Sequence, residues 1–173
     1  KIHLSNFRYE TFNSIFKSIG SIEIKDKLDN TYKFSQIYID TKKKEVFGTD
    51  AQAFLNHKEF KIHKDNNPRV FSNSIEFNKE KTSFKKSVFT LCSYRKNDKC
   101  PPWSLQSSKM LHDRNKKTIY YDNAVLKIFD FPVFYFPKLS HPDPTVDRRS
   151  GFLIPSFSDT KNLGSGLTIP YYL

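Results

Sequence analysis

Residues 130–172 read DFPVFYFPKLSHPDPTVDRRSGFLIPSFSDTKNLGSGLTIPYY, and the interpretation of the whole chain starts from this stretch. It holds most of the nine prolines of the sequence. Pro132, Pro137, Pro142 and Pro144 each fix φ and lack a backbone N–H, so a helix interior or a central strand cannot run through them. Their spacing predicts a rigid, extended connector.

Two short segments separated by turn residues follow this connector. Residues 148–155 read RRSGFLIP, a turn is predicted at 161–164, and residues 166–172 read GLTIPYY. In the last segment Leu167, Ile169 and Tyr171 alternate with other residues. Alternation that ends in aromatic side chains is typical of a strand in a membrane barrel.

The motifs of this stretch resemble the signature of a known family. PVFYFP at 132–137, Pro142, RRSGFLIP at 148–155 and IPYY at 169–172 are similar to the LptD (OstA/Imp) family of lipopolysaccharide-assembly outer-membrane proteins. The resemblance is strong over the last third of the chain and weaker over the rest. It implies a periplasmic β-jellyroll (a β-taco) that receives lipopolysaccharide from a periplasmic bridge. It also implies a large barrel, plugged by a lipoprotein, that delivers the lipid to the outer leaflet.

Length and composition agree with a globular chain. The 173 residues are 37% hydrophobic and 16% aromatic, which suits one core-bearing domain with a small appendage. No apolar run is long enough for a transmembrane helix. The sequence begins at Lys1 without a signal-like region, so we expect an internal fragment of a longer protein.

The formal charge of +11 raises the possibility of a nucleic-acid partner. However, the lysines fall mainly in short runs at predicted turns, as at 42–44, 85–86 and 116–117, rather than along one helix. We therefore expect no nucleic-acid partner, and a basic β-domain that binds nucleic acid is kept as an alternative.

A hairpin repeat occupies the first two thirds of the chain. Asp40, Asn78 and Asp113 are each followed by a Lys-rich turn, and Glu10 begins a weaker copy. Spacings of 38 and 35 residues between these anchors indicate stacked units that cannot bury their apolar faces alone. An apolar residue lies six positions after each anchor, and a small or apolar one eleven after: Val46, Phe84 and Ile119, then Ala51, Phe89 and Ala124.

Strands are predicted before each anchor, at 32–39, 70–77 and 103–112. In the middle strand Phe71, Ile75 and Phe77 share one face by strict alternation, which is typical of a half-buried antiparallel sheet. Residues 1–24 have a partly helical spacing, but we favour strand there because Ile22 and Ile24 also alternate. A further strand at 119–129 is expected to lead into the proline-rich connector without a break.

The predicted fold class is therefore all-β: an OstA-like jellyroll of repeated hairpins, followed by the first strands of an outer-membrane β-barrel. The expected boundaries are 1–140 for the periplasmic jellyroll, 141–150 for the proline-rich connector and 151–173 for the start of the barrel.

Cys92 and Cys100 lie eight residues apart, and three arrangements remain open. They can close a short disulfide loop, remain unconnected thiols, or, as the resemblance implies, form long-range bridges to cysteines near the end of the barrel. The five histidines are scattered, and no motif for zinc, phosphate binding or catalysis is present. We expect no enzyme activity, no metal and no cofactor.

The candidate site residues fall into two groups. Inward apolar positions of the sheet are candidates to line a lipid groove, with a closed dry core as the alternative. These positions are Phe34, Ile37, Ile39, Phe71, Ile75, Phe77 and Leu126.

The other group lies in the proposed barrel entry. Pro155 and Pro170 each remove one backbone donor, and the resemblance implies that such a pair weakens the barrel seam as a lateral gate; prolines that merely end edge strands are the alternative. Arg148, Arg149, Ser150 and Gly151 are candidates for a hinge or for contacts with lipid headgroups.

As the resemblance implies, the expected function is transport of lipopolysaccharide along the jellyroll groove to the gate and its insertion into the outer leaflet of the outer membrane. The expected partners are an LptA-like bridge protein that adds by β-augmentation and an LptE-like plug lipoprotein in the barrel. The expected location is the outer membrane, with this segment mostly periplasmic. A soluble periplasmic lipid-binding bridge module of the same repeat type is the second alternative.

Overall fold

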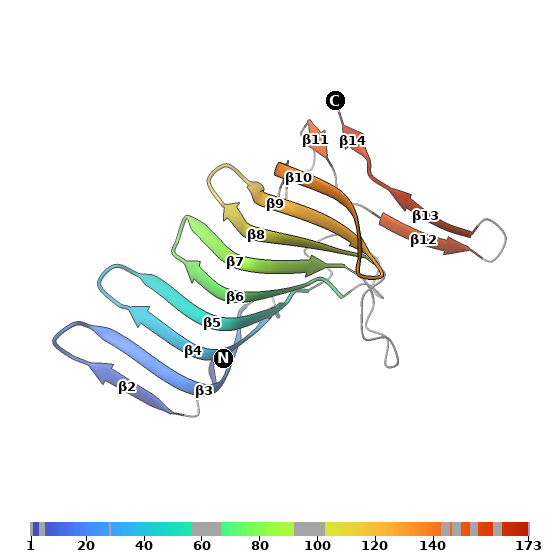
Figure 1. The fold of residues 1–173 in the computed structure, drawn as a ribbon. Coiled ribbons are helices and arrows are strands. Elements are labelled where there is room, and N and C mark those ends of the chain that lie inside the picture. Colours follow the sequence, from blue (N-terminus) through green and yellow to red (C-terminus); the bar gives the residue numbers. More distant parts are fainter. Residues whose placement is uncertain are drawn as a thin grey trace.

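The computed structural model describes residues 2–3, 6–27, 29–56, 67–91, 103–142, 146, 150–152, 156–160 and 164–172. Every regular element within these ranges is a β-strand (Figure 1). The strands are β1 Ile2–His3, β2 Phe7–Glu10, β3 Ile15–Lys25, β4 Thr31–Asp40, β5 Glu45–Phe54, β6 Arg69–Phe77, β7 Lys81–Thr90, β8 Trp103–Asp113, β9 Thr118–Ile128, β10 Phe131–Pro142, β11 Gly151–Phe152, β12 Ser156–Thr160, β13 Gly164–Thr168 and β14 Tyr171–Tyr172.

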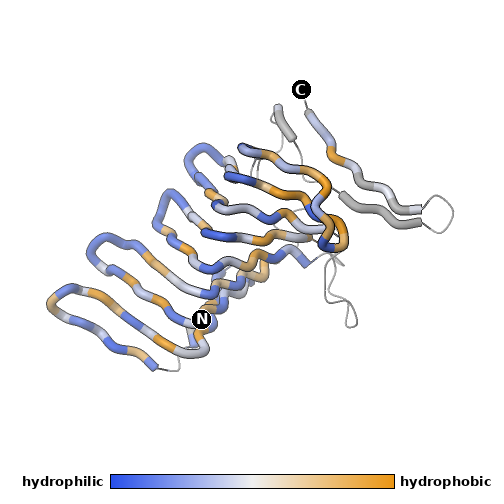
Figure 2. Tube along the Cα trace, viewed as in Figure 1, coloured by the Kyte–Doolittle hydropathy of each residue, from blue (hydrophilic) through white to orange (hydrophobic). Residues whose placement is uncertain are grey.

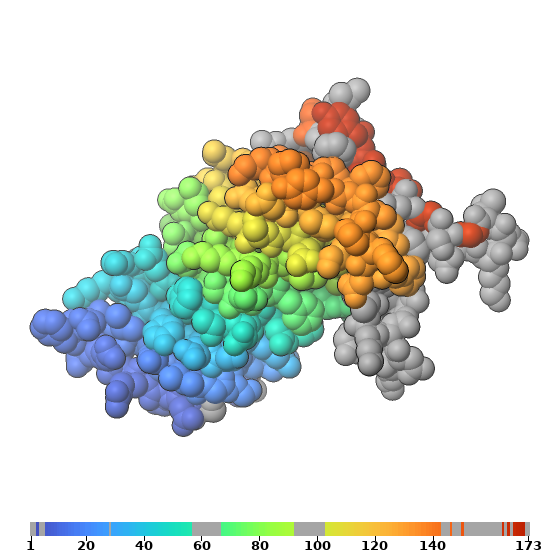
Figure 3. Space-filling model, in the orientation of Figure 1, coloured from blue at the N-terminus to red at the C-terminus, as the bar shows by residue number. Residues whose placement is uncertain are grey.

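The first ten strands form one antiparallel sheet in the order β1-β3-β4-β5-β6-β7-β8-β9-β10, with β2 paired to β3 beside β1. Each strand from β3 to β9 pairs with the next in the chain, so the sheet is a meander whose long axis crosses the strands (Figures 1 and 3). The remaining strands form two small pairs, β11 with β14 and β12 with β13. The predicted all-β class is confirmed, and residues 15–25 are strand rather than helix.

Local side-chain chemistry determines the hairpin turns. The Oδ1 atom of Asp40 accepts the backbone N–H groups of Lys42 at 3.0 Å and Lys43 at 2.9 Å. Asn78 makes the same contacts with the two residues that lead into β7, and Asp113 accepts the N–H of Lys116. Asp and Asn favour turns because their side chains bond the backbone two or three residues on. The turns at these positions are hydrophilic in Figure 2, and the predicted hairpin anchors are confirmed.

One of the predicted repeat correspondences is wrong. The turn after Asn78 is two residues shorter than the others, because the N–H of Asn78 donates to the carbonyl of Lys81, whereas Asp40 pairs with Glu45. The row that contains Val46 and Ile119 consequently passes through Thr82 and not Phe84. Positions in different hairpins are equivalent when backbone pairing places them in one row. Counting residues from the anchor ignores the length of the turn and therefore misplaces Phe84.

Alternate strands bend near their middle. Gly20, Asp50, Lys86 and Asn123 have positive φ values of 117°, 49°, 50° and 51°, and each is the sixth residue of its strand. A positive φ breaks the extended geometry, so the inward alternation slips by one residue at these sites. The slip turns the two arms of each strand toward a common interior, and the curvature is visible in Figure 1.

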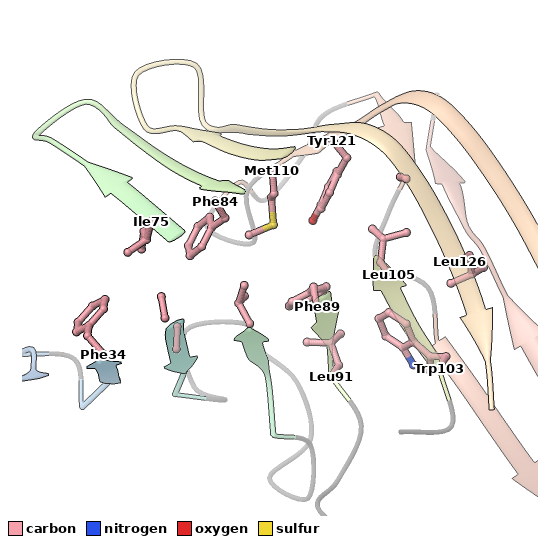
Figure 4. Close-up of a cluster of buried hydrophobic side chains, with 14 of the residues drawn as sticks. Phe34, Ile75, Phe84, Phe89, Leu91, Trp103, Leu105, Met110, Tyr121 and Leu126 are labelled. Carbon is pink, nitrogen blue, oxygen red and sulfur yellow. The ribbon is translucent and has the colours of Figure 1, made fainter. Parts of the chain in front are cut away.

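The interior between the arms is a continuous apolar core (Figure 4). Ile75, Phe84, Met110 and Tyr121 project from one wall toward the other. Trp103, the only tryptophan, is buried and packs edge-on against Phe89 with ring centroids 6.1 Å apart.

The proline-rich segment differs from its prediction. Phe129 and Asp130 form a turn with positive φ, and the chain then returns along β9 as strand β10. Pro132 and Pro137 thus lie in the sheet and not in a connector. Because β10 is the last strand of this sheet, the absence of donors is tolerated there, as it is at sheet edges generally.

Candidate functional site

The inner face of the folded sheet carries side chains in rows that cross the strands. The first apolar row continues, partner by partner, from β4 to β10. Most of its members are buried. The row consists of Ile37, Gly48, Ile75, Phe84, Met110, Tyr121 and Leu139.

A second apolar row lies on the other arm of the same strands. It too runs without interruption from β4 to β10 and ends at Phe134, whose ring is exposed and stacks on Phe136 at the sheet edge. The row consists of Tyr32, Ala53, Val70, Phe89, Leu105, Leu126 and Phe134. Apolar side chains therefore line both of the facing walls in Figure 4.

Between the two apolar rows, the inner face carries small residues. Ala51 pairs with Ser72, Ser72 with Ser87, and Ser87 with Ser107, across β5 to β8. We call these four residues the hydroxyl row; all are buried. The Oγ atoms of Ser87 and Ser107 lie 2.8 Å apart in a hydrogen bond. Sequence reasoning missed this row, because only the strand register brings its residues together.

Six of the seven predicted lining residues lie on the inner face, three of them in the two apolar rows. Phe34, Ile37, Ile75 and Leu126 are buried, and Ile39 and Phe77 are half-buried against the core.

The expectation that Phe71 faces inward is wrong. Its side chain is 37% exposed, on the outer face, where it contacts Phe54 edge-on. Strict alternation put Phe71 on the face of Ile75, but the inward positions of β6 change from Val70 and Ser72 to Ile75 opposite the bend residue Asp50 of β5. A slip of one residue reverses the face of every residue on one side of it.

Gly48 lets the ring of Phe34 lie against the backbone of β5. A Cβ atom at Gly48 would stand 2.6 Å from Cδ1 of Phe34 and 3.3 Å from Cγ2 of Ile75. Such approaches are closer than van der Waals contact allows. The packing of the inner face at this point therefore requires a residue without a side chain. The sequence pattern did not indicate this requirement.

A polar pair secures β10 to the interior. The hydroxyl of Tyr121 lies 3.0 Å from Nε2 of His141, and the two rings stack. Nδ1 of His141 is 2.7 Å from the carbonyl oxygen of Pro142, which can only accept, so Nδ1 donates and Nε2 of the neutral ring accepts from Tyr121. Burial raises the pKa of Tyr121, because the phenolate would lose its hydration.

Several predicted site residues lie outside the described part of the chain: Cys92, Cys100, Arg148, Arg149 and Pro155. Ser150 is exposed, and Gly151 begins β11 opposite Tyr172. Pro170 is half-buried and lies between β13 and β14, so the predicted strand 166–172 is interrupted there. The preceding residue, Ile169, packs against the apolar core.

The described part of the chain contains neither a cluster of metal-ligating side chains nor a helix that could span a membrane. Within the ranges given above, no three His, Cys, Asp or Glu side chains gather in a way that could hold a metal ion. The same ranges contain no helix of the length and hydropathy that crossing a bilayer requires.

Comparison with known proteins gives two kinds of likeness. No protein-family model matches the chain. The LPS-assembly protein LptD of Yersinia pestis is 40% identical over 91 residues, which cover 53% of this chain and 11% of that protein. LptD of Francisella tularensis subsp. novicida is 40% identical over 72 residues, covering 40% of this chain and 8% of that protein. The chain thus spans about a tenth of the length of the curated relatives that it matches.

The likeness to a solved structure concerns the fold alone. LptH of Pseudomonas aeruginosa, described as the LptA-homologous periplasmic component of the lipopolysaccharide transport device, superposes with a TM-score of 0.52. The match covers 74% of this chain and 93% of that one at 5% identity. The resemblance to LptD that the sequence indicated is therefore confirmed over part of the chain, and the jellyroll class is confirmed by the LptH fold.

Proposed function

We propose that this chain is the periplasmic jellyroll of an LptD-type protein and that it carries lipopolysaccharide along its inner face toward the outer membrane. The observation that carries this proposal is the pair of apolar rows, which run unbroken across the strands from β4 to β10. Acyl chains placed along them gain about 0.8 kcal/mol for each CH₂ group removed from water.

The length of the rows suggests movement rather than simple storage. Seven strands at about 4.8 Å spacing extend over roughly 29 Å. One acyl chain spans about 15 Å, half of a bilayer's hydrocarbon core. A lipid on the inner face therefore covers only part of a row, and can advance from strand to strand without leaving hydrocarbon. No bond is made or broken in this process.

Site-specific photocrosslinking in cells tests the proposal, with the crosslinking residue placed in the full-length protein. Phe77 is the probe position, because its side chain is on the inner face and half-buried. Phe71 is the matched control: it is the same residue type in the same strand, but it faces outward. We expect lipopolysaccharide adducts at position 77 and none at 71. Equal labelling at both positions would rule out an interior path.

The same proposal includes a bridge protein that adds a strand to the N-terminal edge. β2 has no proline, and all four of its residues are exposed. At the opposite edge, β10 lacks three backbone donors. An added strand needs a full row of N–H and C=O groups.

Proline substitutions in β2 test the bridge contact. Arg8→Pro and Tyr9→Pro are made separately, because neighbouring residues point their N–H groups to opposite sides of a strand. One of the two should remove the bridge protein from affinity-purified complexes. Phe12→Ala, in the turn after β2, is the control and should keep it. Retention by both proline variants would exclude this edge.

We further propose that residues 151–173 enter a membrane barrel that an LptE-like lipoprotein plugs, with Pro155 and Pro170 weakening its seam and Arg148, Arg149, Ser150 and Gly151 at the membrane boundary. The loss of one backbone donor at each proline supports this idea. Pro155→Ala combined with Pro170→Ala should lower the amount of lipopolysaccharide at the cell surface, measured against total lipopolysaccharide. Unchanged surface levels would remove the gate from the proposal and leave the jellyroll path intact.

A further inference from the structure

The hydroxyl row sets serines in a part of the interior that is otherwise hydrocarbon. Ser72, Ser87 and Ser107 are 7%, 1% and 3% exposed. On the same strands the first apolar row supplies Ile75, Phe84 and Met110 on one side, and the second row supplies Val70, Phe89 and Leu105 on the other. The serine hydroxyls thus run along the middle of the inner face, parallel to both apolar rows.

The bend of the sheet explains why these residues are small, but not why they carry hydroxyl groups. Ala51 directly follows Asp50, and Ser87 directly follows Lys86, which are both bend residues with positive φ. Two arms of a strand converge there, so only small side chains have room. Ala51 satisfies that demand without a polar atom. Serine at the next three positions of the row therefore needs a separate reason.

Ser72 supplies the observation that points to a ligand. Ser87 and Ser107 bond each other, whereas the buried Oγ atom of Ser72 has no hydrogen-bond partner. Burying a hydroxyl without a partner is unfavourable, and the large majority of buried polar groups are bonded. Alanine at this position would avoid the penalty. A binding partner that enters the interior would satisfy the hydroxyl and complete the row.

We propose that the hydroxyl row binds the polar group next to the alkyl tail of an acylated lipid: a chain hydroxyl, an ester or an amide. This inference rests on the proposed function, since it requires lipid on the inner face. Serine both donates and accepts, so it suits all three groups. Neighbouring strands are about 4.8 Å apart, so a polar group leaving one serine is already near the next. The row acts as a polar track beside two apolar ones.

Binding of two fatty acids that differ by one hydroxyl tests the inference on the full 173-residue chain. The probes are β-hydroxymyristic acid and myristic acid, whose alkyl tails are equal in length. We expect the hydroxylated acid to bind about fivefold more tightly, the value for one added neutral hydrogen bond. Ser72→Ala should reduce this preference, and the triple alanine variant of Ser72, Ser87 and Ser107 should abolish it while myristic acid still binds.

Ser83→Ala is the matched control, because Ser83 lies in β7 with Ser87 but is directed to the other face, opposite Glu76 and Leu111. It should keep the full preference. Ser72→Ala replaces a side chain by a smaller one without filling space, so the single variant remains informative if the triple variant fails to fold.

The outcomes separate the two proposals. Equal binding of both acids by the unaltered chain, or a preference that survives Ser72→Ala undiminished, overturns the polar track and leaves the apolar path standing. Failure of both acids to bind counts against lipid on the inner face altogether.

Discussion

The two ends of the long sheet are built differently. At the N-terminal end, β2 lies wholly exposed beside β3, and the sequence has no proline before Pro68. At the C-terminal end, β10 contains three prolines and sends Leu139 and His141 toward the core. Both ends expose large apolar side chains, such as Phe7 and Phe131. Hydrophobicity alone therefore does not distinguish the ends.

What distinguishes the two ends is the backbone. An edge strand with every N–H group present can pair with another chain, whereas an edge interrupted by proline cannot do so along its length. Of the two edge strands described, β2 thus keeps the donors that an added strand would need, whereas β10 lacks three. The two ends of the sheet are therefore not equivalent in their backbone donors. Mutations at each end show whether the interior packing differs as well.

The largest contrast is expected between Leu126→Ala near the C-terminal end and Phe7→Ala at the N-terminal end. Leu126 is 1% exposed, so its truncation should lower the free energy of unfolding by about 2–5 kcal/mol. Phe7 is 71% exposed and stacks on Phe16, so its loss should cost less than about 1 kcal/mol. Urea unfolding measures both. Similar values would mean that the two ends are equally well packed.

Gly48→Ala tests whether the N-terminal half is tightly packed inside although its edge is open. The new methyl group collides with the ring of Phe34, and we expect a loss of about 1–3 kcal/mol in the free energy of unfolding. In a Phe34→Leu background the same substitution should cost clearly less, because the ring has gone. An identical cost in both backgrounds would mean that the ring is not what excludes the methyl group.

Tyr121→Phe tests the bond that secures β10. It leaves Nε2 of His141 without the hydroxyl donor, and we expect a loss of about 1–2 kcal/mol near neutral pH. Hydrogen exchange in β10 should become faster, while β2 exchanges as before. If β10 keeps its protection, its attachment does not depend on the bond between Tyr121 and His141.

The raised pKa of Tyr121 predicts that the free energy of unfolding depends on pH in the alkaline range. Burial raises the pKa of Tyr121, so the folded state holds the phenolic proton more tightly than the unfolded state does. This contribution to stability is fully present below the ordinary tyrosine pKa of about 10, and is lost as the pH rises through the raised value. Tyr121→Phe should flatten the decline in unfolding free energy above that pH. An unchanged alkaline slope would contradict the assignment.

The smallest effect is expected at the turn before β9. The N–H of Lys116 bonds the Asp113 carboxylate and lowers its pKa, so the stabilisation is present above the ordinary Asp pKa of about 3.9 and is lost as the pH falls through the lowered value. Asp113→Asn should keep the turn but reduce the acid dependence of the unfolding midpoint. Asn78 accepts the N–H three residues on in the same way, in a shorter turn and without a titrating group, so Asn78→Ala should weaken the fold without altering that dependence.

The hairpin repeat could be predicted from the sequence because turn chemistry is local. Asp40, Asn78 and Asp113 bond backbone groups two or three residues away, so each turn is encoded within a handful of positions. The strands before these anchors agree with the prediction within one residue at each end. The motifs at 132–155 and 169–172 likewise indicated LptD, which 40% identity over 91 residues confirms.

The sequence by itself thus determined the strands before the three anchors, the turns after them and the family likeness, since these depend on neighbours along the chain. Only the tertiary structure decided which face of β6 carries Phe71, that the prolines lie in an edge strand, and that three serines from separate strands form one buried row. Each of these depends on a bend or on pairing between strands, and a one-residue slip in either reverses the face of every side chain beyond it.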